Sequence, residues 1–287
     1  MVGLKGELVS ISTDDRVRLD GFYCEAEQPS AIGLDAAIIT HGLGGNFYGS
    51  RLLKHLASVL HELGMSVVLA NTRGHDNLTT TVRMGQLATL GAGYEIVSDC
   101  RLDLKGWSDF LIRRGHQNQL LFGHSLGAIK SLYAFAHESL DVVKSIVALS
   151  ATRLSHERLL ASKNGENFRE MLRLAKSLVD EGKPDELMKV TFPFSTWMAA
   201  GPYLEKYGPE DRYNWFRFAD RITVPTLLVY GETELAEHPA FQGMESEIQD
   251  LQTRNSNLDF KTVPKADHFY SGCFQSVGEV VKDWLQR

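Results

Sequence analysis

The chain has 287 residues, which is enough for one large domain or for one domain with a substantial insertion. Hydrophobic residues make up 43% of it and charged residues 23%, a balance that excludes an intrinsically disordered chain. Because the net charge is −6 and no basic stripe runs along the chain, we expect neither nucleic acid nor a membrane as a partner.

Other features narrow the class of protein further. The first ten residues lack the long apolar core of a signal peptide, and no stretch approaches the ~18 apolar residues typical of a membrane helix. The three cysteines, Cys24, Cys100 and Cys273, do not suit a disulfide framework. Neither CxxC nor HExxH spacing occurs, so we expect no metal and no cofactor. A reducing, cytoplasmic location is the expectation.

Short apolar runs alternate with helix-period stretches along most of the chain. Residues 7–12 and 16–23 lie a few positions apart and predict an antiparallel hairpin at a sheet edge. The runs typical of strands in a parallel sheet are residues 36–40, 65–70, 120–122, 145–149, 226–230 and 258–262. Helical patterns cover residues 51–63, 94–114, 274–285 and the stretch after 125. This alternation predicts an α/β fold with a mostly parallel central sheet and helices on both faces.

The alternation breaks midway along the chain. Residues 152–221 are helix-like and then aromatic, with several prolines and no convincing buried strand. We therefore predict a core in two parts, 1–151 and 222–287, with a helical cap insertion at 152–221. The cap is expected over the carboxyl edge of the sheet, where open α/β folds bind ligands. Most of its aromatic residues are expected to form its own core, while Phe194 and Trp197 are candidates for a substrate pocket.

A Gly-x-Ser-x-Gly sequence, with Ser125 at its centre, follows one predicted strand and precedes a predicted helix. Its two glycines, Gly123 and Gly127, leave room for a sharp turn on which the serine adopts a strained backbone conformation. At the start of a helix, free N–H groups favour developing negative charge. We expect Ser125 to be a nucleophile and the N–H of Leu126 to donate to an oxyanion. The alternative is a serine that only caps the helix.

A second glycine-rich segment, His41-Gly42-Leu43-Gly44-Gly45, follows the strand at 36–40. We expect the N–H of Leu43 to be the other oxyanion donor. His41 is expected to hold the loop through hydrogen bonds, and it is a further candidate for lining the substrate pocket. A phosphate-binding loop is the rival interpretation, but neither GxGxxG nor GxxxxGK[ST] is present.

A nucleophilic serine needs a neutral imidazole within hydrogen-bond reach and a carboxylate behind that imidazole. His268 lies in a loop between the last predicted strand and the last helix, whereas the rival His238 follows an acidic loop with no strand before it. Three glutamates follow the strand at 226–230 and compete for the role of the acid: Glu232, Glu234 and Glu237. Asp267, next to His268, is expected to cap a turn.

Together these motifs resemble the α/β-hydrolase superfamily, in its capped, serine esterase/lipase-like branch, over nearly the whole chain. Asn71-Thr72-Arg73-Gly74-His75 also resembles the Arg-Gly-His turn that many members have after their second parallel strand. The resemblance implies the chain order serine, acid, histidine. It therefore assigns Ser125, Glu234 and His268, because Glu234 holds the acidic place of the family's Gly-x-x-Asp pattern. The departure is glutamate in place of the usual aspartate.

The resemblance further implies hydrolysis of a carboxylic ester with a small, apolar acyl or aryl part, through an acyl-enzyme on Ser125. Serine at the turn argues against dehalogenase or epoxide hydrolase chemistry, which resembling families run through an aspartate. Thioester, lactone, amide or carbon–carbon bond hydrolysis and acyl transfer stay open as alternatives. So does a ligand receptor on the same scaffold. The expected partner is a small-molecule substrate, and the oligomeric state is open, a homodimer included.

Overall fold

An eight-stranded sheet forms the centre of the computed structural model, which describes residues 3–287. Its strands are β1 (Glu7–Ser12), β2 (Arg18–Cys24), β3 (Ala36–Thr40), β4 (Ser66–Ala70), β7 (Gln119–His124), β8 (Val143–Leu149), β11 (Thr226–Gly231) and β12 (Leu258–Val263). Their order is β1-β2-β4-β3-β7-β8-β11-β12. The strands from β4 to β12 pair in parallel, and β1 and β2 form an antiparallel edge. The predicted α/β fold and edge hairpin are confirmed.

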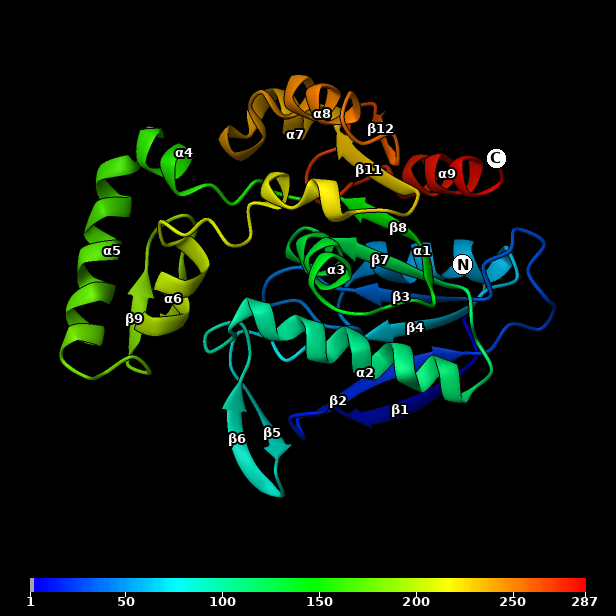
Figure 1. Cartoon of the computed structure of the whole chain (residues 1–287), viewed down its shortest axis with the longest axis horizontal. Coiled ribbons are helices and arrows are strands. Elements are labelled where there is room, and N and C mark those ends of the chain that lie inside the picture. The colour runs from blue at the N-terminus through cyan, green and yellow to red at the C-terminus, as the bar shows by residue number, and fades with distance from the viewer. Residues whose placement is uncertain (1–2) are drawn as a thin grey trace.

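Each face of the sheet has its own hydrophobic core, because successive side chains of a strand point to opposite faces. Ile38 and Leu121 pack with one set of helices, and their neighbours Ile39 and Phe122 pack with the other. The first set is α2 (Cys100–Arg113), α3 (Leu126–His137) and α8 (Met244–Gln252), and the second is α1 (Arg51–Glu62) and α9 (Phe274–Leu285) (Figure 1). Within residues 3–287, no helix has both the length and the apolar character needed to cross a bilayer.

One helix begins later than its sequence pattern predicts. The predicted helix at 94–114 becomes a 3-10 turn at Val97–Asp99 followed by α2. The backbone just before it is engaged elsewhere, since Ala92 donates to the carbonyl of Asp76 and Gly93 to that of Asn77. These bonds tie the residues before the segment to the turn after β4, and the N–H of Tyr94 closes a turn onto the carbonyl of Gly91 ahead of the helix.

A hairpin of β5 (Thr79–Arg83) and β6 (Gln86–Leu90) projects from the molecule and has no counterpart among the predicted strands (Figure 1). Its side chains are mostly exposed, with Met84 74% and Leu87 81% accessible. A strand that buries neither face has no hydrophobic period of two to detect. The turn of this hairpin also lacks the usual sequence signal, because the residue with a positive φ, 54°, is Met84, and few residues other than glycine adopt such a φ.

The insertion between β8 and β11 contains α4 (His156–Ala161), α5 (Gly165–Asp180), β9 (Leu187–Val190), β10 (Thr196–Ala199) and α6 (Ala200–Tyr207). The sequence predicts no convincing buried strand here, but the structure has two short strands, β9 and β10, that pair antiparallel. Each has only four residues, too few for a clear periodic signal. The insertion has a core of its own, which includes Phe168, Met188 and Tyr203. It stands beside the edge of the sheet toward which the parallel strands point (Figure 1).

A buried arginine holds the turn that follows β4. Arg73 is 4% exposed, and its Nε and Nη2 donate to Oδ1 of the fully buried Asp103 over 2.9 and 2.8 Å. The backbone N–H of Arg73 donates to Oδ2 of the same carboxylate over 2.8 Å, and Nη1 donates to Asp15 over 3.0 Å. Because the carboxylate of Asp103 binds both the guanidinium and the backbone N–H of Arg73, it fixes the course of the turn, and with it the position of the adjoining Thr72.

We expect Asp103→Asn to lower the free energy of unfolding by about 3 to 5 kcal/mol, because it leaves the buried Arg73 charge short of its main partner. Asp109→Asn on the same helix is the matched control. Its carboxylate is 37% exposed and pairs with Lys105, so its loss should cost about 1 kcal/mol or less. Urea denaturation of the three proteins measures both effects, and equal losses in the two variants would contradict the assignment.

Candidate active site

Ser125 lies on a sharp turn between β7 and α3. Its backbone adopts φ 56° and ψ −123°, a conformation that L-residues rarely take. The turn also packs tightly against the end of β3. A Cβ placed on Gly127 would lie 2.6 Å from the carbonyl oxygen of Thr40 and 2.5 Å from that of His41. Only glycine fits there, which is why the small residue after the serine is needed.

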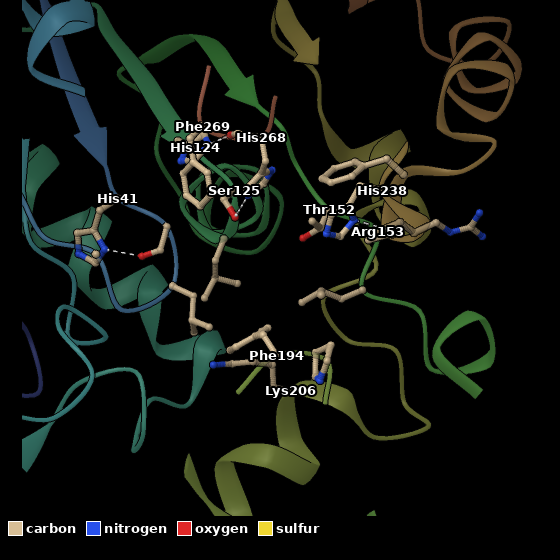
Figure 2. A pocket seen from close by; sticks show the side chains of 18 of the residues that line it. His41, His124, Ser125, Thr152, Arg153, Phe194, Lys206, His238, His268 and Phe269 are labelled. Carbon is tan, nitrogen blue, oxygen red and sulfur yellow. Dashed lines mark hydrogen bonds between the residues drawn. The ribbon is translucent and has the colours of Figure 1, made fainter. Parts of the chain in front are cut away.

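The structure brings together the three side chains that the sequence singles out. Nε2 of His268 lies 3.1 Å from Oγ of Ser125, and Nδ1 of His268 lies 2.8 Å from Oε2 of Glu234. Glu234 is on α7 (Glu232–Glu237), directly after β11, and His268 is in the loop after β12. Figure 2 shows His268 beside Ser125. With Nδ1–H directed at the carboxylate, Nε2 is free to accept the proton of the serine.

Two groups that the sequence analysis did not identify hold the carboxylate of Glu234, which is 3% exposed. Its Oε1 accepts a hydrogen bond from Oγ of Ser150 over 2.6 Å and one from the backbone N–H of Gly231 over 2.7 Å. Tyr270 lies 3.0 Å from Ser150 Oγ and donates its own proton to the carbonyl of Val229. Ser150 follows β8 immediately, so its place at the carboxyl end of a strand was the available signal.

The rival residues occupy other positions. His238 accepts a hydrogen bond from the N–H of Ala240, and in the described part of the chain it bonds to no acid. Glu232 accepts from the backbone of Lys265 and is exposed, as is Glu237. Asp267 accepts from the backbone N–H groups of residues 269 and 271, as expected of a turn cap.

Two backbone N–H groups are available near Ser125. Across residues 3–287, neither the N–H of Leu43 nor that of Leu126 has a hydrogen-bond acceptor, and both residues line the same cavity as Ser125. The two turns touch, because a Cβ on Gly42 would lie 3.1 Å from Cβ of Ser125. Unpaired N–H groups beside a nucleophilic oxygen are the donors that an oxyanion requires.

Two buried histidines are neutral supports of these turns. Nδ1–H of His41 donates to the carbonyl of Gly42 over 2.8 Å, and its Nε2 accepts from the N–H of Thr72 over 3.2 Å. Nε2–H of His124 donates to the carbonyl of His268 over 2.7 Å. Burial lowers the pKa of His41 to about 3 and that of His124 to about 4. Neither ring is charged at neutral pH, so His268 is the imidazole placed to exchange a proton with Ser125.

A cavity of about 1050 Å³ lies between the sheet and the insertion, with Ser125 and His268 in its wall. Figure 2 shows Phe194 and Lys206 on the side opposite these two residues and His41 at one flank. The apolar side chains that line the cavity include Leu43, Leu126, Leu154, Leu159, Phe194, Phe241, Phe269 and Phe274. Residues 3–287 contain no group of three or more His, Cys, Asp or Glu side chains arranged to hold a metal ion.

The structure corrects the expectation for one substrate-pocket candidate. His41 and Phe194 line the cavity, but Trp197 is not among the lining residues and is 49% exposed. Trp197 is on β10, where the next residue, Met198, is buried in the core of the cap. Since neighbouring side chains of a strand point to opposite faces, burying Met198 directs Trp197 outward.

No protein-family model matches the sequence, and a comparison with curated proteins finds no match. Solved structures do match. Est1E from Butyrivibrio proteoclasticus, solved with ferulic acid bound, is 18% identical, with a TM-score of 0.65 over 96% of this chain and 97% of that chain. The α/β hydrolase GrgF from Penicillium sp. sh18 is 15% identical, with a TM-score of 0.70 over 99% of both chains. The Pyrococcus furiosus esterase Pf2001 is 17% identical, with a TM-score of 0.61 over 98% of this chain and 92% of that chain.

The strained backbone of Ser125 should lower the free energy of unfolding, and this can be tested. Ser125→Gly should raise the free energy of unfolding by about 1 kcal/mol, because glycine adopts a positive φ without the clash of a Cβ. Ser125→Ala is the control, since alanine keeps the Cβ and its strain. Thermal or urea unfolding of the three proteins provides the comparison, and an equal stability of the two variants would argue against strain at this residue.

Proposed function

The chain has the α/β-hydrolase fold, and from this premise we propose that it is a serine hydrolase that cleaves a carboxylic ester through an acyl-enzyme on Ser125. The observation that supports the proposal most directly is the pair of contacts made by His268, 3.1 Å to Ser125 Oγ and 2.8 Å to Glu234 Oε2. The likeness to structures described as esterases points in the same direction.

In the first half of the reaction, Oγ of Ser125 attacks the ester carbonyl carbon while Nε2 of His268 takes the hydroxyl proton. The carbonyl oxygen becomes an oxyanion and accepts hydrogen bonds from the N–H groups of Leu43 and Leu126. Glu234 stabilises the imidazolium that forms. The tetrahedral intermediate then collapses, His268 gives its proton to the departing alcohol oxygen, and the acyl group stays bonded to Ser125.

In the second half, a water molecule takes the place of the alcohol. His268 accepts a proton from this water as its oxygen attacks the acyl carbon, and the same two N–H groups stabilise the second oxyanion. Collapse of that intermediate breaks the bond to Ser125, and His268 returns the proton to the serine oxygen. The carboxylic acid leaves, and the protein is restored. No other group on the chain has to gain or lose a proton.

The cavity supports a substrate with an apolar acyl or aryl part. Its walls are rich in leucine and phenylalanine, and its volume of about 1050 Å³ is that of a small-molecule site. Phe194 comes from the cap and Phe269 from the loop after His268, so an apolar group bound between them would contact both parts of the protein.

Ser125→Ala should lower kcat for p-nitrophenyl butyrate by about 10⁴-fold or more while the protein stays folded, because the attacking oxygen is lost. Wild-type protein should react covalently with a fluorophosphonate probe at Ser125, identified by mass spectrometry of the labelled peptide. Full turnover by the variant would remove Ser125 as the nucleophile. A Ser125 that stays unlabelled while a small molecule binds would favour a receptor on a hydrolase scaffold.

Glu234→Gln should lower kcat by about 10³-fold or more, since a neutral amide neither fixes the tautomer of His268 nor stabilises its charged form. Glu232→Gln is the matched control, because that exposed glutamate is on the same short helix and bonds only to the backbone of Lys265. Steady-state kinetics on both variants give the ranking. The reverse ranking would assign the acid to Glu232.

A further inference from the structure

The charged side chains that line the cavity are all of one sign. Five are basic: Arg51, Arg153, Arg158, Lys163 and Lys206. Among the described residues that form the lining, none is Asp or Glu. The chain as a whole has the opposite balance, with 36 acidic and 30 basic residues. The sign of the charge at the cavity therefore departs from that of the protein.

Two of these cations are free at the surface of the cavity. Arg51 is the first residue of α1, in the core, and Lys163 is in the loop between α4 and α5, in the cap. Both are exposed, and within residues 3–287 neither side chain has a hydrogen bond or an ion pair. Positive charge therefore flanks the cavity from both parts of the protein.

Two others share a single acid. Nη1 of Arg153 lies 2.7 Å from Glu247, and Arg158 contacts the same carboxylate. Glu247 is on α8 and is not among the lining residues. Arg153 also lies over the ring of Phe216, 4.6 Å from its centroid. Two cations and one anion leave one positive charge on this side of the cavity.

The fifth cation is buried. Lys206 is 4% exposed, and its Nζ has no hydrogen-bond partner in residues 3–287. The acid whose charge acts most strongly on it, Glu95, is itself paired with the buried Lys130, 2.5 Å away. Burial lowers the pKa of Lys206 to about 8 and raises that of neighbouring Glu205 to about 7. A pKa of about 8 still leaves Lys206 protonated at pH 7, and its Nζ has no bonded carboxylate in residues 3–287.

We propose that the cavity selects esters that have a carboxylate distant from the bond to be cleaved. Charges beside a cleft with low-dielectric walls concentrate ions of the opposite sign within it, and buried charges are screened less than exposed ones. The apolar walls accept the body of such a molecule, and the cations favour its charged end. The position of the cleaved bond rests on the proposed hydrolase function, whereas the preference for a negative charge rests on the cavity alone.

Binding to Ser125→Ala tests the preference without any turnover. The ligands are 4-phenylbutyrate and its primary amide, which share a shape and differ in charge, and calorimetry measures both affinities. We expect the carboxylate to bind about tenfold more tightly at low salt, with the difference shrinking in about 1 M NaCl, where the Debye length is about 3 Å. An amide that binds as tightly as the carboxylate, or an absence of binding by both, overturns the proposal.

Charge reversal identifies the cations responsible. Lys163→Glu and Arg51→Glu, each made in the Ser125→Ala background, should each reduce the preference for the carboxylate by about three- to tenfold. Lys144→Glu in the same background is the matched control, because Lys144 is exposed at the start of β8, at the opposite edge of the sheet. Equal losses in all three would mean that only the overall charge of the protein matters, and would overturn the proposal.

Turnover by the wild-type protein separates this inference from the proposed function. One pair of esters, p-nitrophenyl hemiglutarate and p-nitrophenyl pentanoate, places the charge on the acyl side. The other pair, butyrate esters of 4-hydroxybenzoate and 4-hydroxybenzamide, places it on the leaving group. A higher kcat/KM for the anion in either pair supports the proposal and locates the charge. Turnover of all four without preference overturns it, whereas preferential carboxylate binding without any turnover overturns the hydrolase function alone.

Discussion

The close contact between two turns determines the geometry of the whole site. Gly127, two residues after Ser125, lies against the carbonyl groups of Thr40 and His41, at a distance that leaves no room for a Cβ. This contact sets the oxygen of Ser125, the proposed nucleophile, beside the loop that contains Leu43, so the serine and the two N–H groups lie in turns that pack directly against each other. The strain at Ser125 persists because β7, α3 and the end of β3 together determine its backbone.

The parallel sheet explains how residues far apart in sequence meet at this unit. Neighbouring parallel strands end at the same edge, and here each of five strands delivers one component of the site. The Leu43 loop follows β3, Ser125 follows β7 and Ser150 follows β8, while Glu234 and His268 follow β11 and β12. The order β3-β7-β8-β11-β12 therefore places the Leu43 loop at one end, Ser125 and the N–H of Leu126 next to it, and His268 with Glu234 at the other end.

The parts of the site that could be predicted from sequence are those in which a local backbone requirement restricts the residue type. Glycines around Ser125 and buried apolar strands are such requirements, and the strand positions and the elbow follow from them. Glu234 and His268 were assigned by the chain order that the family resemblance implies, whereas no motif marks Ser150 as the donor to Glu234. Trp197 was wrongly placed in the pocket because its strand, β10, has only four residues and so gives a weak periodic signal. The β5–β6 hairpin was missed because its side chains are mostly exposed and therefore show no alternation of apolar and polar residues.

The positive charge around the cavity bears on the proposed reaction as well as on the proposed choice of substrate. In the proposed reaction, a field that attracts an anion also stabilises the oxyanion on the ester carbonyl, but it opposes the positive charge that His268 acquires in the same step. Glu234 offsets that opposition locally, because it is buried, lies 2.8 Å from His268 and is held by two hydrogen-bond donors. His41 and His124 add no charge, since burial lowers the pKa of both well below neutrality. In the proposed mechanism, the buried glutamate therefore allows a charged His268 to form beside a cavity that is itself positively charged.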